Sequence, residues 1–187
     1  VYAYNSNPYF RNVEFKYNTS PYYGGAFYAY NPDTNKTITF ERTTFTSNSV
    51  TPGTGYGTDL RGGAVYLRYS GKVVFENCVF DSNSIKINSA NSNRGGAIFS
   101  HQNYDSLVVR NTKFRYNKVY KPDGNNGGST HGGAIYVEDG RDHFFVINSV
   151  FIGNESLAGY YTYSGGESGG YDNNGHAGAI YVSMQSY

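Results

Sequence analysis

The sequence predicts an all-β protein that folds as a right-handed parallel β-helix, with three strands in each coil and about five coils. Two repeated motifs lead to this prediction. Gly-Gly-Ala, followed by a hydrophobic and then an aromatic residue, begins at positions 24, 62, 95 and 132, with a variant Ala-Gly-Ala at 177. Phe-x-x-Asn recurs between these copies, with its phenylalanine at 15, 45, 80, 114 and 151. Such self-similarity is typical of stacked supersecondary units, so we expect residues 1–187 to form one domain.

The first strand of each coil starts at the paired glycines, which allow a sharp corner and a close approach of the backbone. Along this strand a hydrophobic residue alternates with an aromatic one. The two kinds of residue therefore form two columns that face opposite sides of the sheet. Periodicity alone does not decide which column faces in. We expect the aromatic column to face outward, as a stripe suited to a sugar chain or a neighbouring subunit: Tyr28, Tyr66, Phe99, Tyr136 and Tyr181.

The second strand carries inward hydrophobic residues at alternate positions, such as Val73 and Phe75. A turn residue follows, and the third strand contains the phenylalanine of Phe-x-x-Asn. Equivalent residues of neighbouring coils lie about 4.8 Å apart in such a stack. We therefore expect a buried phenylalanine ladder, worth roughly 1.5–3 kcal/mol per ring. The asparagines at the corners are expected to tolerate the left-handed conformation and to hydrogen-bond to their equivalents along the stack.

Two further columns follow from the same register. The single Cys78 occupies the position of Thr43, Thr112 and Ser149, so we interpret it as one member of a column of small residues. On the surface, the register places Arg11 beside Glu41 and Glu76 beside Arg110. Such cross-strand pairs are worth roughly 0.2–1 kcal/mol and help to hold the register.

The segment between Phe-x-x-Asn and the next glycine pair varies most in length, from 5 residues at 19–23 to 22 residues at 155–176. All these loops leave from the same corner, so they are predicted to form one flank. Insertions on one face of a solenoid often mark the binding face. The longest loop offers tyrosines, which give contact area at low entropic cost: Tyr160, Tyr161, Tyr163 and Tyr171. The alternative is a solvated insertion without a ligand.

A second candidate group precedes each glycine pair and consists of Tyr23, Arg61, Arg94, His131 and His176. These side chains form a column able to hold an anionic sugar or a sulfate. The interpretation that we favour is that they hydrogen-bond to loop carbonyls and close the corner. His131 and His176 lack a recurring third ligand, so we expect no metal and no cofactor. Among the three Asn-x-Ser/Thr sequons, Asn35 is the best glycosylation candidate because it lies in a turn.

Composition limits the partners. The chain has 15 basic and 14 acidic residues and a net charge of +1, which argues against nucleic acid. It contains no apolar run near 20 residues, so we expect no membrane insertion within this segment. Val1 begins inside a strand and neither end carries a cap. We expect either a segment of a longer β-helix or end-to-end self-association into a filament.

The repeated Gly-Gly-Ala-Ile/Val together with Phe-x-x-Asn resembles the repeat of the chlamydial polymorphic membrane proteins. The resemblance extends over the whole chain, although this sequence has no tryptophan and is rich in tyrosine. It implies a surface-exposed right-handed parallel β-helix, outside the cell or on its surface, with a role in adhesion. The implied partners are other protein subunits or host and surface glycans.

The competing function is that of a polysaccharide-binding or polysaccharide-degrading β-helix, since parallel β-helices also host pectin lyases and glycosidases. Glycoside hydrolysis needs two carboxylates across a groove. Glu138, Asp139 and Asp142 lie in one short turn, and the neighbouring coils supply no matching acid. Fold alone does not confer activity. We therefore expect a non-catalytic protein.

Overall fold

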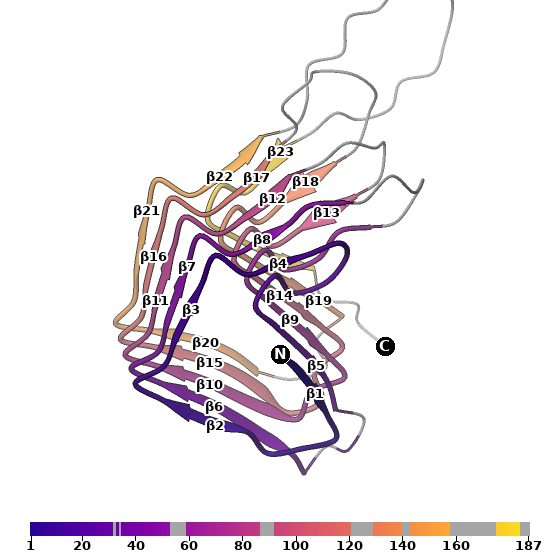
Figure 1. Cartoon of the computed structure of the whole chain (residues 1–187), viewed down its shortest axis with the longest axis vertical. Helices are drawn as coiled ribbons and strands as arrows, with labels where there is room; N and C mark the ends of the chain where they lie inside the picture. Colours follow the sequence, from indigo (N-terminus) through magenta and orange to yellow (C-terminus); the bar gives the residue numbers. More distant parts are fainter. Residues whose placement is uncertain are drawn as a thin grey trace, which may run out of the picture.

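The chain winds repeatedly around one axis, and its strands stack in parallel from pass to pass (Figure 1). The computed structural model describes residues 1–31, 33, 35–52, 59–86, 92–120, 129–139, 143–157 and 175–183. These residues contain strands and turns and no helix, and hence no helix that is long and apolar enough to cross a membrane. The predicted all-β solenoid is confirmed.

Five parallel sheets are formed, which we name A to E in the order in which the chain visits them. Sheet A contains β1 (Tyr2–Tyr4), β5 (Phe27–Tyr30), β9 (Val65–Arg68), β14 (Ile98–His101), β19 (Ile135–Glu138) and β24 (Ile180–Ser183). Sheet B contains β2 (Tyr9–Arg11), β6 (Thr37–Glu41), β10 (Lys72–Glu76), β15 (Ser106–Arg110) and β20 (His143–Ile147). Sheet C contains β3 (Glu14–Lys16), β7 (Thr44–Thr46), β11 (Val79–Asp81), β16 (Lys113–Arg115) and β21 (Val150–Ile152).

Sheets D and E were not predicted. Sheet D contains β4 (Thr19–Ser20), β8 (Ser49–Val50), β12 (Ser84–Lys86), β17 (Lys118–Tyr120) and β22 (Glu155–Leu157), and sheet E contains β13 (Asn93–Arg94), β18 (Thr130–His131) and β23 (Gly175–His176). The expected three strands per coil is therefore wrong, because the residues on both sides of the loops are also extended and paired. About five coils were expected. Sheet A has six strands, sheets B, C and D have five each, and sheet E has three.

Sheets A, B and C surround the main core, in which the predicted phenylalanine ladder is confirmed. Successive ring centroids of Phe15, Phe45, Phe80, Phe114 and Phe151 lie 5.0, 4.6, 4.7 and 4.8 Å apart. A second stack from sheet B, made of Phe10, Phe40 and Phe75, packs beside it. Rings of the two stacks meet edge to face, as Phe40 and Phe45 do at 5.4 Å. This is the arrangement that the ring quadrupoles favour.

The asparagines of Phe-x-x-Asn form a continuous ladder. The Asn48 side-chain amide donates to Asn83 Oδ1 at 3.0 Å, and that of Asn83 donates to Asn117 Oδ1 at 2.9 Å. The left-handed residue of this corner is not the asparagine itself but the residue before it, for example Ser82 with φ 56°. At the preceding corner the expected positions do adopt positive φ: Asn12, Arg42, Asn77, Asn111 and Asn148.

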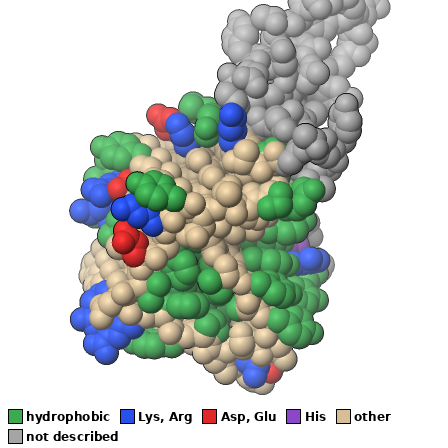
Figure 2. Space-filling view, in the orientation of Figure 1, with side chains coloured by type: hydrophobic (Ala, Val, Ile, Leu, Met, Phe, Trp, Pro, Cys, Tyr) green, Lys and Arg blue, Asp and Glu red, His purple; other side chains and the backbone are tan. Residues whose placement is uncertain are grey.

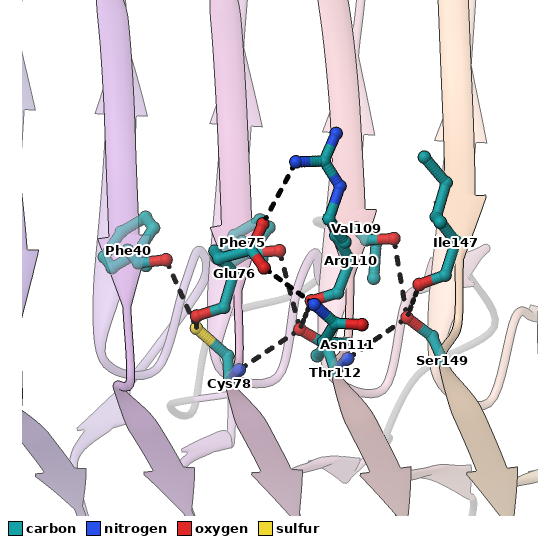
Figure 3. Close-up of polar contacts among 10 residues, drawn as sticks. All are labelled: Phe40, Phe75, Glu76, Cys78, Val109, Arg110, Asn111, Thr112, Ile147 and Ser149. Atoms are coloured by element: carbon teal, nitrogen blue, oxygen red, sulfur yellow. Dashed lines mark hydrogen bonds and ion pairs between the residues drawn. The ribbon is translucent and has the colours of Figure 1, made fainter.

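The column of small residues is confirmed at the corner between sheets B and C (Figure 3). The Cys78 thiol lies 3.4 Å from the carbonyl oxygens of Phe40 and Glu76, and the Cys78 N–H donates to Thr112 Oγ1 at 3.2 Å. Burial raises the pKa of the Cys78 thiol to about 11, so it stays protonated and is a poor nucleophile.

The two predicted charge pairs form as well. Arg11 Nε lies 3.5 Å from Glu41 Oε1, and Arg110 Nη1 lies 3.4 Å from Glu76 Oε2. Glu76 also accepts a hydrogen bond from Asn111 at 2.8 Å (Figure 3). These groups are partly exposed, and they serve the register rather than a site.

Candidate functional site

The loop flank begins where sheets D and E project beyond the main core (Figure 1). Strands of sheet D lead into the loops, and the short strands of sheet E lead back from them. Because both sheets are in register, the bases of successive loops lie side by side. The loop tips themselves, including Tyr160, Tyr161, Tyr163 and Tyr171, lie outside the described residues.

Sheets D and E form an arm with a small hydrophobic seam of its own. The seam consists of Val50, Leu60, Ile85 and Val119, none of which is more than 1% exposed. Two hydrogen bonds connect segments of the arm. The Leu60 N–H donates to Asn93 Oδ1 of β13 at 3.3 Å, and Ser156 Oγ of β22 donates to Thr130 Oγ1 of β18 at 3.0 Å. The loop bases are therefore held by packing and by hydrogen bonds.

The glycine corner attaches this arm to sheet A. Gly62 adopts φ 65°, where residues with a side chain are strained. At Gly63 a Cβ atom would lie 2.0 Å from Gly96 O and 2.8 Å from the backbone of Ser84 in sheet D. Only glycine permits this approach, which explains why the motif contains a pair.

The aromatic column of sheet A points away from the main core, because the residues that alternate with it belong to that core. The expectation that the column forms an exposed stripe is nevertheless wrong. Tyr66 and Phe99 are 0% exposed and Tyr136 is 4% exposed. Tyr28 and Tyr181 at the two ends are partly buried.

The residues that precede the glycine pairs cover the aromatic column, and we call them the covering column: Tyr23, Arg61, Arg94, His131 and His176. Arg61 lies over the rings of Tyr66 and Phe99, at 5.9 and 5.5 Å from their centroids. His131 packs edge to face on Tyr136 at 5.6 Å and on Tyr181 at 5.0 Å. Arg61 and His131 thus each bridge the aromatic residues of two passes. Cation–π contacts of this kind contribute about 0.5–2 kcal/mol each.

The sequence did contain a signal for this layer. Each covering residue stands five positions before the aromatic residue of its own pass, although Arg94 packs on Tyr136 of the next pass: Tyr23 and Tyr28, Arg61 and Tyr66, Arg94 and Phe99, His131 and Tyr136, His176 and Tyr181. The glycine corner between the two positions turns the chain back on itself. A cationic or aromatic residue at a constant distance before an aromatic one, across a glycine turn, indicates a contact between them.

Within the described residues, Arg61 and Arg94 of the covering column are engaged by side chains, and most of the loop residues whose carbonyls they were expected to bind lie outside these residues. Arg61 donates to the Tyr66 hydroxyl at 3.1 Å and pairs with Asp59 at 3.2 Å. Arg94 pairs with Glu138 at 3.0 Å. Their charges are therefore compensated inside the protein, which weakens the idea that they hold an anion. His131 and His176 stack at 5.0 Å, and burial, followed by the effect of His176, lowers the pKa of His131 to about 4.

The acidic turn after sheet A lies beside this layer. His101 Nε2 lies 3.9 Å from Glu138 and 3.8 Å from Asp139. Burial is the main reason why the pKa of His101 falls to about 4, so the ring is neutral near pH 7. Burial also raises the pKa of the Glu138 carboxyl. The third acid of the turn, Asp142, lies outside the described residues.

Other candidate groups are placed as follows. Asn35 is exposed in its turn, and its N–H donates to Asp33 Oδ1 at 3.0 Å. Asn18 and Asn154 both belong to the asparagine ladder. Within the described ranges no three His, Cys, Asp or Glu side chains lie close enough together to hold a metal ion.

Comparison with known proteins identifies the repeat. Residues 12–30 match the model of the Chlamydia polymorphic membrane protein repeat. This segment runs from the turn before β3, through Phe15 and Asn18, to the end of β5, so it contains one copy of each motif. No curated protein and no solved structure matches the chain. The chain thus carries a repeat of the polymorphic membrane protein type within a parallel β-helix.

Proposed function

We propose that this parallel β-helix is a non-catalytic extracellular or cell-surface protein that makes adhesive or structural contacts through its loop flank. The observation that carries the proposal is the arm of sheets D and E. A separate seam and its hydrogen bonds hold the loop bases in a fixed order. A solvated insertion without a role needs no such support.

The composition of the loops fits a contact surface. The longest loop places Tyr160, Tyr161, Tyr163 and Tyr171 among glycine and serine residues. Tyrosine side chains bring large contact areas with few rotatable bonds, and small residues let the backbone adapt. The partners that suit such a surface are other protein subunits or surface glycans.

The surface charge favours these partners over nucleic acid. Acidic and basic residues are nearly equal in number. On the face shown in Figure 2, basic side chains are scattered and several lie next to acidic ones, with hydrophobic side chains between them. A single-sign field that would attract a polyanion is absent from this face. The repeat match supports a location on the cell surface.

Loop replacement tests the proposal. Residues 158–174 would be replaced by a short Gly-Ser linker, and residues 121–128 would be replaced in a matched control. Circular dichroism and thermal unfolding should show a folded β-helix in both variants. Binding of the labelled protein to host-cell surfaces and to a glycan array should fall for the first variant. Unchanged binding in a folded 158–174 variant would contradict the proposal.

A polysaccharide-active β-helix is the second candidate, because a carboxyl with a raised pKa stands beside His101 and Asp139. Against it, Glu138 is already paired with Arg94 at 3.0 Å. Lyase and hydrolase activity would be measured on a panel of polysaccharides with the wild type, Glu138→Gln and Asp139→Asn. Activity that both substitutions abolish would replace the adhesive proposal with an enzymatic one.

A further inference from the structure

The corner between β14 and β15 contains buried polar groups that have no hydrogen-bond partner. Among the described residues they are the Ser100 hydroxyl, Gln102 Oε1 and both polar atoms of the Asn103 amide, and of these residues Ser100 and Asn103 line a pocket. Ser100 is 1% exposed and Asn103 is 5% exposed. Buried polar side chains in folded proteins are almost always paired with protein groups or with ordered water, so an unpaired cluster calls for a specific explanation.

Ser100 does not follow the pattern of the neighbouring passes, whereas Asn103 aligns with Ser70, another buried polar residue. Ser100 pairs in register with Leu67 and Val137, which are apolar and belong to the main core. At the corresponding corner of an earlier pass, Asn31, which aligns with Gln102, is hydrogen-bonded to the backbone of Ser6. It accepts a hydrogen bond from the Ser6 N–H at 3.2 Å and donates to the Ser6 carbonyl at 3.0 Å. The amide of Asn103 has no such contact.

The unpaired groups of Ser100 and Asn103 line one small pocket. Its apolar walls are formed by Leu107, Val137 and Phe144, and Asp105 and His143 also border it. The pocket has a volume of about 10 Å³. This is about the space that one water molecule requires, and it is too small for an organic ligand.

The chemistry of the lining selects the ligand. Asn103 presents both a donor and an acceptor, and the Ser100 hydroxyl is able to act as either. A bare cation would leave the amide N–H groups unpaired, and an anion would leave the amide oxygen unpaired. A small neutral molecule that both donates and accepts satisfies all three atoms.

We propose that this pocket is a binding site for one structural water molecule, hydrogen-bonded to the Ser100 hydroxyl and the Asn103 amide. The water allows a polar pair to lie within an otherwise apolar corner of the solenoid. The site is independent of the loop flank and of the proposed adhesive function.

A high-resolution crystal structure of the whole chain tests the proposal. We expect a density peak about 2.7–3.2 Å from Ser100 Oγ and from the Asn103 amide. In solution, the Asn103 side-chain amide protons should show a nuclear Overhauser effect to a long-lived water molecule. The Ser100→Val variant restores the apolar column, and both signals should disappear. The Ser100→Ala variant removes the hydroxyl without filling the pocket, and the contact with Asn103 should remain.

Several outcomes would overturn the proposal. One is a well-ordered pocket without density, or a direct bond between Ser100 and Asn103 that closes it. Another is a backbone or side-chain group of residues 140–142 bonded to these atoms. A third is a peak with oxygen distances of about 2.3–2.6 Å that becomes anomalous after a manganese soak, which would indicate a cation. If Ser100→Val fails to fold, the wild-type density and the wild-type nuclear Overhauser effect still show whether a water molecule occupies the pocket.

Discussion

Phe80 lies in the middle of the aromatic ladder, with the ring of Phe45 at 4.6 Å on one side and that of Phe114 at 4.7 Å on the other. It is fully buried. Removing the ring leaves a cavity that the rigid coils above and below have little freedom to close. Phe80→Ala should therefore lower the free energy of unfolding by about 3–5 kcal/mol, measured by denaturant titration. Val79→Ala on the outer face of the same strand should cost below about 1 kcal/mol. Similar losses for both variants would show that the ring is not a core element.

Asn83 makes four side-chain hydrogen bonds in the ladder. Its amide donates to Phe45 O and Asn117 Oδ1, each at 2.9 Å, and its Oδ1 accepts from the N–H and the amide of Asn48, each at 3.0 Å. Asn83→Ala should cost on the order of 3 kcal/mol, because it leaves buried partners unpaired.

Asn83→Asp adds a pH dependence. A buried aspartate that faces two acceptors should have a folded-state pKa well above its unfolded value of about 3.9. Stability is then greatest below that unfolded pKa, where the carboxyl is protonated and donates one bond, and it falls as the pH rises through the folded pKa. At pH 7 the loss relative to wild type should reach about 3–5 kcal/mol. Urea titrations at pH 4 and pH 7 would measure this. Equal losses for Asn83→Asp at both pH values would contradict a buried ladder, and Asn83→Ala is the pH-independent control.

At the scale of the strands, the sequence predicted the side-chain columns and pairs that depend only on the register between coils. The phenylalanine ladder, the column that contains Cys78 and the Arg11–Glu41 pair follow once the coils are aligned, because alignment decides which residues are neighbours. It did not predict sheets D and E. Their strands are two or three residues long beside loops of variable length, too short to show an alternating pattern. The burial of Tyr66 was missed as well, since alternation gives the side of a sheet but not what covers it.

The glycine pair joins three elements, and its two positions differ. The first glycine is replaced by Ala177 in the last copy, with φ 53°, whereas the second is glycine in every copy. At Gly62 a Cβ atom would lie 2.0 Å from Val65 O within the same turn, but Ala177 occupies this motif position with a Cβ atom, so Gly62→Ala should cost about 1–2 kcal/mol. Gly63→Ala places that atom against the backbones of Gly96 and Ser84, so it should cost more than about 3 kcal/mol. Unfolding by urea would compare them, and an equal or reversed order would refute this account of the corner.

At the scale of the molecule, the described residues bury three apolar clusters: the main core, the covered aromatic column of sheet A and the seam of the arm. The main core lies inside sheets A, B and C, and the seam of the arm lies between sheets D and E. The glycine corner separates them, and backbone pairing between passes runs through both. A solenoid is stabilised by contacts between neighbouring units, so a local defect need not spread through the whole structure. We therefore predict that the arm loosens while the scaffold remains folded.

Ile85→Ala tests whether the arm is a separate unit of stability. Ile85 packs in the seam with Val50 and Val119 and does not contact the main core cluster. Its truncation should weaken the seam by about 2–3 kcal/mol, which raises local opening by about 30-fold or more. Hydrogen exchange should accelerate in β8, β12 and β17 and stay nearly unchanged in β10 and β11. Val73→Ala in the main core is the matched control, and it should accelerate exchange in β10 and β11 as well. If Ile85→Ala raised exchange equally in all these strands, the two cores would form one cooperative unit, and the loop flank would not be able to adapt to a partner without unfolding its support.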